Sequence, residues 1–339
     1  MIPLHPAAAA ASTGLRKLTG TIDMAHGTSS DPSFRILFHA AIVTVPRGSA
    51  RTPPSKEDGA DRVLSPPRTN VTAPAASPGS DALVAYLKLS GSRPFRSGPR
   101  VRSGAVFGGE LLALGLRAAA ACAPHDVLPH SLHAFFLRGG DGAPALVADV
   151  TPVRDGRSLR VREVSISAGA GERCRIVVSF HRAEDRDDYA APPPLAPDPD
   201  GPGPWRDDPF TYLDDSLPFD VRHVSAPTSA ADPATVRFWA RTRGQLPAEP
   251  VLHLCAQAMA SDMRTGVAAA APLKAPWGGA ISLDHVMWFH RPIRADEWFL
   301  VDIRPHSVAA GRGLVAGSVY APNGTLGASF GQELLVRPG

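Results

Sequence analysis

Two stretches of the chain decide the fold: GELLALGLRAAAAC, from Gly109 to Cys122, and VLHLCAQAMASDM, from Val251 to Met263. Both are long enough for a helix, and apolar residues occupy nearly every face of each helix rather than one stripe. A helix of this kind is buried all round, yet neither stretch reaches the roughly 18 apolar residues of a membrane span. Burial therefore has to come from a sheet that wraps around each helix.

The residues after the two helices repeat in the same order. Three pairs of matching motifs, 153, 155 and 150 residues apart, are Phe135–Arg138 with Trp288–Arg291, Gly156–Leu159 with Gly311–Leu314, and Ser179-Phe180 with Ser329-Phe330. Alternating apolar and polar residues predict strands at Leu146–Val153, Arg160–Ile166, Arg175–Phe180, Phe299–Ile303 and Leu314–Val319. Each half thus has one helix followed by about four strands. We expect an α+β protein of two tandem hotdog domains, each a curved antiparallel sheet wrapped around a central helix.

Proline and glycine divide the chain of 339 residues, a length that suits about two domains. Residues 1–80 are rich in Ala, Ser, Thr, Pro and Gly, and we interpret them as a disordered or leader-like extension. The first hotdog is expected over residues 81–190 and the second over residues 216–339. A proline-rich linker at residues 191–215 separates the two, because its prolines rule out both a helix and a central strand.

Charge, cysteine and histidine patterns exclude several classes of function. The net charge of +3 is too small to indicate nucleic acid as a partner. The three cysteines lie far apart without a C-x-x-C pair, so we expect neither a disulfide framework nor a zinc site. His130 with His133, and His285 with His290, are spaced to lie on opposite faces of a strand. We therefore expect surface or hydrogen-bonded histidines, no metal and no cofactor.

Two further features bear on chemistry. The stretch Gly327–Gly331 matches the G-x-S-x-G nucleophile elbow, but neither histidine nor aspartate follows it, so a strand is the better interpretation. Asp262 ends an apolar helix, where the helix terminus and buried neighbours disfavour a carboxylate. Two interpretations stay open for Asp262: a buried functional group, or an exposed carboxylate that caps the turn Arg264–Gly266 and pairs with Arg264.

Three motifs resemble the acyl-CoA thioesterase II family: VFGGE at Val106–Glu110, HSLHAFFLRGGD at His130–Asp141, and above all LDHVMWFHRP at Leu283–Pro292. The resemblance covers roughly Asp81–Pro338. It implies a double hotdog that hydrolyses fatty acyl-CoA to free fatty acid and CoA, and an assembly of two or more copies. It also implies a catalytic trio of aspartate, threonine and glutamine, which falls on Asp262, Ser282 and Gln332.

The trio suggests how a thioester is cleaved without a covalent intermediate. Asp262 would act as the base toward a water that Ser282 and Gln332 hold, and the hydroxyl of Ser282 replaces that of the usual threonine. The first hotdog, with His181-Arg182 near the position that matches Gln332, is expected to be catalytically empty. The phosphates of CoA would lie among surface arginines such as Arg291, Arg294 and Arg312.

Two alternatives use the same scaffold. An enoyl-CoA hydratase or dehydratase would need a histidine and an acid facing each other, such as His285 or His290 with Asp284. A non-catalytic acyl-CoA-binding protein would bind substrate without turnover. For location we expect the cytoplasm, because the C-terminal residues are not a peroxisomal S-K-L address; a peroxisome, or an organelle reached through the leader, is the alternative.

Overall fold

The computed structural model describes residues 78–102, 104–139, 145–169, 171–184, 186–203, 215–224, 235–274 and 277–338. The extension predicted over residues 1–80 lies outside them, apart from its last three residues. The predicted linker is described from residue 191 to residue 203 and again at residue 215.

Each half of the described chain has one central helix and a set of strands. The first half contains α1 (Ser80–Tyr86), β1 (Phe95–Arg96), α2 (Gly108–Ala121), β2 (Leu128–Phe136), β3 (Val147–Asp155), β4 (Leu159–Ala168) and β5 (Gly171–His181). The second contains β6 (Phe219–Val224), β7 (Val236–Thr242), α4 (Pro250–Ser261), α5 (Thr265–Ala270), β8 (Trp277–Ser282), β9 (Asp284–Phe289), β10 (Phe299–Ala309), β11 (Arg312–Tyr320) and β12 (Leu326–Pro338). Among the described residues, no helix is long and apolar enough to cross a membrane.

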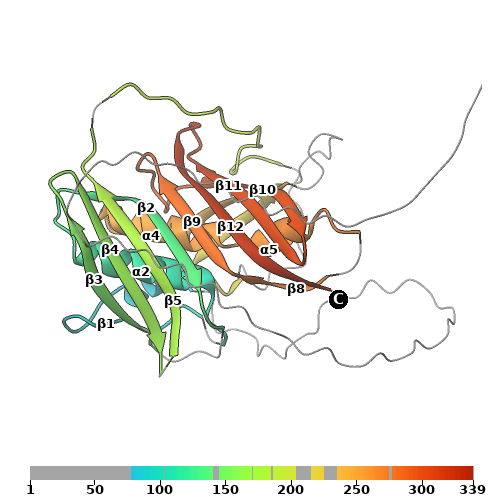
Figure 1. Cartoon of the computed structure of the whole chain (residues 1–339). Coiled ribbons are helices and arrows are strands. Elements are labelled where there is room, and N and C mark those ends of the chain that lie inside the picture. Colours follow the sequence, from blue (N-terminus) through green and yellow to red (C-terminus); the bar gives the residue numbers. More distant parts are fainter. Residues whose placement is uncertain are drawn as a thin grey trace, which may run out of the picture. The chain divides into compact units, whose positions relative to one another are not determined.

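The strands form one continuous antiparallel sheet in the order β1-β3-β4-β5-β2-β9-β12-β11-β10-β7-β6, and β8 pairs with β12 beside this path (Figure 1). The two halves join where β2 pairs with β9, with Leu132 opposite Met287. The central helices α2 and α4 lie against the inner face of this sheet (Figure 1). The predicted fold, two tandem hotdogs of the α+β class, is therefore confirmed.

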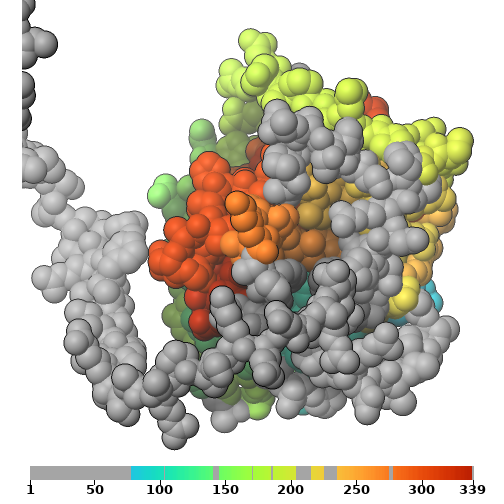
Figure 2. Space-filling model, turned by 90° about the vertical axis from the view of Figure 1, so that its right-hand side faces the viewer, coloured from blue at the N-terminus to red at the C-terminus, as the bar shows by residue number. Residues whose placement is uncertain are grey.

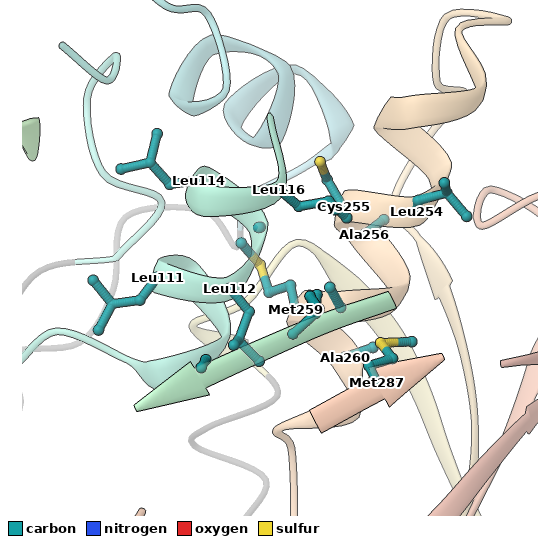
Figure 3. Packing of buried hydrophobic residues seen from close by; sticks show 14 of the residues in the cluster. Leu111, Leu112, Leu114, Leu116, Leu254, Cys255, Ala256, Met259, Ala260 and Met287 are labelled. Carbon is teal, nitrogen blue, oxygen red and sulfur yellow. The ribbon is translucent and has the colours of Figure 1, made fainter. Parts of the chain in front are cut away.

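The two central helices pack against each other in opposite directions. Arg117, near the end of α2, pairs with Glu249 before the start of α4. At the other end of the contact, Gly108 at the start of α2 lies beside Asp262 at the end of α4. Leucine side chains of α2 meet Met259 and its neighbours on α4, and Met287 of β9 lies below them (Figure 3). Each helix is buried because the other helix covers the side that the sheet leaves open.

Among the described residues, the second half has more strands than the sequence predicts. The hairpin of β6 and β7 precedes α4 and extends the sheet beyond β10. Both strands are short, and apolar and polar residues alternate in them only in part, so the two-residue period that indicates a strand is too weak to predict them. The strand register also corrects one motif match. Phe135 pairs with Arg175 and Trp288 pairs with Ser329, so Ser329 corresponds to Arg175, and not to Ser179.

Residues 191–203 of the predicted linker form neither helix nor strand, yet they are fixed to the second hotdog. The Trp239 indole N–H donates to the carbonyl of Pro197 at 3.0 Å, and the Trp298 indole N–H donates to Asp200 at 2.9 Å. Just before the linker, Asp188 accepts a hydrogen bond of 2.7 Å from Arg291. Figure 2 shows this yellow-green segment lying over the yellow and orange residues of the second half. The domain boundaries at residues 190 and 216 stay a prediction.

We expect Gly109→Ala to lower the melting temperature. This is the opposite of the usual effect, since alanine in a helix interior normally makes a protein more stable than glycine does, by about 0.5–1 kcal/mol. A Cβ at Gly109 would lie 2.4 Å from the carbonyl oxygen of Met259, so the backbones of α2 and α4 would have to separate. Thermal unfolding followed by circular dichroism measures the effect. Gly139→Ala is the control, because a Cβ there meets no atom within 4 Å. A melting temperature for Gly109→Ala equal to that of wild type would contradict this account of the helix contact.

Candidate active site

Asp262 stands at the C-cap of α4 and is buried, with 6% of its surface exposed. Its Oδ1 accepts a hydrogen bond of 2.8 Å from Nε2 of Gln332. The backbone N–H of Gly109 and the hydroxyl of Ser282 also face the carboxylate and act to lower its pKa. The interpretation of Asp262 as an exposed turn cap paired with Arg264 is therefore wrong, and Arg264 instead lies 3.3 Å from Nε2 of His223.

Gln332 connects the other two members of the predicted trio. It lies in β12, is fully buried, and its Nε2 also donates to the hydroxyl oxygen of Ser282 at 2.7 Å. Ser282 is the last residue of β8. The structure thus brings Asp262, Ser282 and Gln332 together from a helix end and two paired strands.

A break between β8 and β9 shapes this part of the site. Strand β12 pairs with both: Gly331 lies opposite Val286, and Leu334 lies opposite Ser282. Gly331 and Leu334 are three residues apart on β12, but their partners Val286 and Ser282 are four residues apart. At the break, the Leu283 N–H donates to Glu333 of β12, while the Leu283 carbonyl accepts from Phe136 of β2, both at 2.9 Å. The extra residue is a local bulge, which turns side chains relative to a regular strand.

The bulge brings a fourth side chain to the trio. Residues three apart point to opposite faces of a regular strand, yet Ser282 and His285 both contact Gln332. The Nδ1 atom of His285 lies 2.7 Å from Oε1 of Gln332, and its Nε2 lies 3.0 Å from the hydroxyl of Ser261. Sequence analysis gave His285 no role in this site, because the bulge is invisible in the alternation of residues. The sequence signal that could have indicated it is the polar pair Asp284-His285 within an otherwise apolar strand.

The first hotdog also contributes to the site through the start of α2. A Cβ at Gly108 would lie 2.6 Å from Oδ2 of Asp262, so only glycine leaves room for the carboxylate at this distance. The N-terminus of a helix carries unpaired N–H groups and partial positive charge. The second hotdog supplies the acid, and the first supplies the helix end that faces it. Sequence analysis did not foresee this contribution.

The first hotdog lacks the polar residues themselves. When Phe135 is aligned with Trp288, as in the repeated motifs, Leu132 matches His285, and the strand paired with each then matches Val178 to Gln332. In this alignment His181 lies three residues beyond the position that matches Gln332, so the match of Gln332 with His181-Arg182 does not agree with it. Leu132 and Val178 are both fully buried. Where the second half has a hydrogen-bonded pair, the first has a purely apolar contact.

Burial gives two groups of the site unusual proton affinities. Burial raises the pKa of Asp262 from 3.8 to about 7, although hydrogen bonds from Gln332, Gly109 and Ser282 act in the opposite direction. Burial also lowers the pKa of His285 to about 4, with its contact to Gln332 acting the other way. Near neutral pH, Asp262 therefore exchanges protons readily while His285 is uncharged. A carboxyl tuned in this way suits a general base.

The other candidates from the sequence lie elsewhere or are otherwise engaged. Arg291, Arg294 and Arg312 each form an ion pair with a carboxylate, namely Asp188, Asp296 and Glu333. Ser329 of the G-x-S-x-G match lies within β12 and is 3.0 Å from Nε2 of His290. Within the described ranges, no group of three or more His, Cys, Asp or Glu side chains could hold a metal ion.

Two family models match most of the described chain. Residues 98–181 match the acyl-CoA thioesterase N-terminal domain, and residues 186–336 match the acyl-CoA thioesterase C-terminal domain. The chain belongs to the acyl-CoA thioesterase family. The resemblance of the sequence motifs to acyl-CoA thioesterase II is thereby confirmed.

Individual members of the thioesterase family agree with this assignment. The chain is 29% identical to acyl-CoA thioesterase 2 of Haemophilus influenzae over 253 residues, which cover 68% of the chain and 87% of that protein. It is also 29% identical to acyl-coenzyme A thioesterase 8 of Mus musculus, over 68% of the chain and 80% of that protein. Among solved structures, the acyl-CoA thioesterase II TesB2 from Mycobacterium marinum is 31% identical and has a TM-score of 0.65, covering 76% of the chain and 98% of that structure.

We expect Asp262→Asn to stabilise this thioesterase, and more so as the pH rises. In the folded protein the Asp262 carboxyl keeps its proton up to about pH 7, whereas an unfolded chain loses it near pH 4. The buried Asp262 carboxyl therefore lowers the free energy of unfolding by an amount that grows from about pH 4 to about pH 7 and is constant above pH 7. The gain in melting temperature should grow from pH 4 to pH 7 and then level off.

A matched control is Asp296→Asn. Burial alone raises the pKa of Asp296, but the Leu246 N–H and Arg294 outweigh burial and hold the pKa below its ordinary value. Asp296 thus contributes stability that is present near neutral pH and lost in acid. Asp296→Asn should destabilise the protein most near pH 7. If Asp262→Asn showed this same sign, its carboxyl would not be held neutral by burial.

Proposed function

We propose that Asp262, Ser282 and Gln332 activate the water that cleaves acyl-CoA in this enzyme. As a member of the thioesterase family, the enzyme hydrolyses acyl-CoA thioesters to a free fatty acid and CoA. The observation that supports the proposed trio is the bridging amide of Gln332, which donates to Asp262 at 2.8 Å and to Ser282 at 2.7 Å. One buried amide thus fixes the base and the hydroxyl at one point.

The proposed first step is a single proton transfer coupled to attack. Ionised Asp262 accepts a proton from a water, while the oxygen of that water forms a bond to the thioester carbonyl carbon. The hydroxyl of Ser282 orients the water, and the amide of Gln332 holds both the carboxylate and this hydroxyl in place. The tetrahedral intermediate then expels the CoA thiolate, which takes up the proton that Asp262 received. The products are the fatty acid and the CoA thiol, and Asp262 is again ionised.

The start of α2 would stabilise the charge that develops on the carbonyl oxygen. Oδ2 of Asp262 faces Gly108, and the Gly109 N–H already contacts the carboxylate. A thioester attacked by a water on Asp262 would therefore place its oxygen near the positive end of this helix. Helix N-termini and backbone N–H groups serve as oxyanion holes because they are already oriented toward the charge.

The hydratase alternative receives no support from the geometry of the histidines. His285 points to the inner face and bonds with Gln332 and Ser261. The neighbouring Asp284 accepts the backbone N–H of Glu333 at 2.9 Å. His285 and Asp284 therefore bond to different partners and do not form the histidine–acid pair that a hydratase would need.

We also propose that the enzyme forms a homodimer or a higher homo-oligomer. Phe135 and Trp288 lie on the outer face where β2 meets β9, and 60% and 42% of their surfaces are exposed. Covering such apolar side chains with a second copy is favourable. Sedimentation velocity should give at least twice the chain mass, and Trp288→Glu should shift the distribution toward the monomer. A wild-type enzyme that sediments as a monomer would refute the proposal. The cytoplasmic location stays a prediction.

We expect Asp262→Asn to lower kcat by at least about 100-fold, the usual scale for loss of a general base. CoA release from octanoyl-CoA and palmitoyl-CoA, trapped by a thiol reagent, measures turnover. The wild-type kcat should rise with pH around a midpoint near 7, because only the ionised carboxyl of Asp262 accepts a proton.

Asp126→Asn is the control, since Asp126 is an exposed carboxylate paired with Arg182, and this variant should turn over like wild type. Equal turnover by wild type and Asp262→Asn would keep the reaction and discard the site. Absence of turnover in both would favour a binding protein or a hydratase, and loss of the conjugated double bond of an enoyl-CoA would then distinguish these two.

A further inference from the structure

The orientation of the Gln332 amide is a chemical requirement of the site just described. Both hydrogens of its Nε2 are used, one toward Asp262 and one toward Ser282. If the amide were turned by 180°, its oxygen would face the ionised carboxylate of Asp262, and two acceptors would repel each other. Because an amide group turns easily about its last bond, something outside the trio has to hold it.

His285 is placed to hold the Gln332 amide. Oε1 of Gln332 can only accept, so the Nδ1 atom of His285 at 2.7 Å has to carry a hydrogen. The imidazole is uncharged near neutral pH, and its other nitrogen, Nε2, is then an acceptor. The hydroxyl of Ser261 lies 3.0 Å from that nitrogen and also 3.0 Å from the carbonyl oxygen of Ala258, and its one hydrogen is shared between these two acceptors. The Gln332 oxygen therefore requires the tautomer of His285 that carries its hydrogen on Nδ1.

The histidine ring itself has little freedom. It stacks on Phe330 of β12, with centroids 5.6 Å apart and planes inclined by 14°. The ring is fully buried, and Ser261 is held in turn by the end of α4, because its Oγ lies 3.0 Å from the carbonyl oxygen of Ala258. These contacts connect the end of α4 through Ser261 and His285 to Gln332.

The first hotdog shows that packing alone does not require a polar pair here. At the matching positions it has Leu132 opposite Val178, both fully buried in the same kind of sheet. A buried polar pair costs free energy unless its hydrogen bonds are complete. The second half nevertheless has His285 and Gln332, with every contact just described in place.

We propose that His285 is a positioning residue, whose Nδ1–H donates to Oε1 of Gln332 and thereby directs both amide hydrogens of Gln332 toward Asp262 and Ser282. The proposal rests on the proposed function of the trio. His285 touches neither the water nor the thioester, and acts only through Gln332. Its loss should therefore impair catalysis and change the proton affinity of Asp262, with substrate binding nearly unchanged.

The test compares two replacements of His285. His285→Leu introduces the residue that the first hotdog has at this position and removes the donor. His285→Asn places its amide nitrogen the same number of bonds from Cα as Nδ1 and keeps the donor. We expect His285→Leu to lower kcat about 10- to 100-fold, the scale of one hydrogen bond to a charged group, with KM within about threefold of wild type. His285→Asn should recover most of this loss.

The pH profile separates positioning from simple damage to the fold. With the Gln332 amide no longer held, Asp262 loses a donor that lowers its pKa. The midpoint of kcat should therefore move to higher pH in His285→Leu and return toward the wild-type value in His285→Asn. In a Gln332→Ala background, His285→Leu should cause no further loss of kcat. Wild-type kcat and midpoint in His285→Leu would overturn the proposal, as would an equal loss in both replacements.

A measurement on the unaltered enzyme covers the case in which the leucine variant does not fold. Nitrogen-15 NMR of the histidine side chains, with the His285 signals assigned by their loss in His285→Asn, shows which ring nitrogen carries the hydrogen. We expect Nδ1, and a hydrogen on Nε2 would overturn the proposal. If Asp262→Asn loses turnover while His285→Leu does not, only this inference fails. If Asp262→Asn turns over like wild type, the proposed trio itself fails.

Discussion

The close contact of the two central helices determines the rest of this structure. Gly109 lies so near the Met259 carbonyl that the helices meet almost backbone to backbone. Because they run in opposite directions, the end of α4 comes to the start of α2. The apolar character of both helices, which predicts burial on every side, is satisfied by this mutual contact together with the sheet. The arrangement also brings an acid from one half to the helix start of the other.

Asp262 is held between opposing influences. The end of α4 and the surrounding apolar side chains disfavour its charge, whereas the start of α2, Gln332 and Ser282 favour it. The resulting pKa of about 7 lies far above that of an ordinary aspartate. A carboxyl in water is too weak a base to take a proton from water efficiently, and a fully desolvated one would not ionise. The mixed surroundings therefore cost stability and provide basicity, a trade-off common at functional sites.

The sequence predicts the fold well because its strongest signals are physical. Two helices that are apolar on every face, followed by matching series of strands, leave few architectures available. The trio could be predicted only through the resemblance of motifs, since the burial of Asp262 was undecided from the residues alone. The positions of His285 and Gly108 beside the trio could not be predicted, because they depend on a one-residue bulge at Leu283 and on a contact between the halves. Neither the bulge nor the contact can be inferred from the alternation of apolar and polar residues or from the composition. The β6–β7 hairpin was missed for a simpler reason, its short and irregular pattern.

The segment that crosses from the first hotdog to the second has a consequence for how the site assembles. Separate hotdog chains would have to find each other in solution, and dilution would take them apart. Here the two halves share one chain, and the tryptophan indoles bind the connection to the second half. Meeting of the halves is therefore intramolecular, with a high effective concentration. The contact between α2 and α4 is thus independent of enzyme concentration, and each chain carries its own complete set of the groups that surround Asp262.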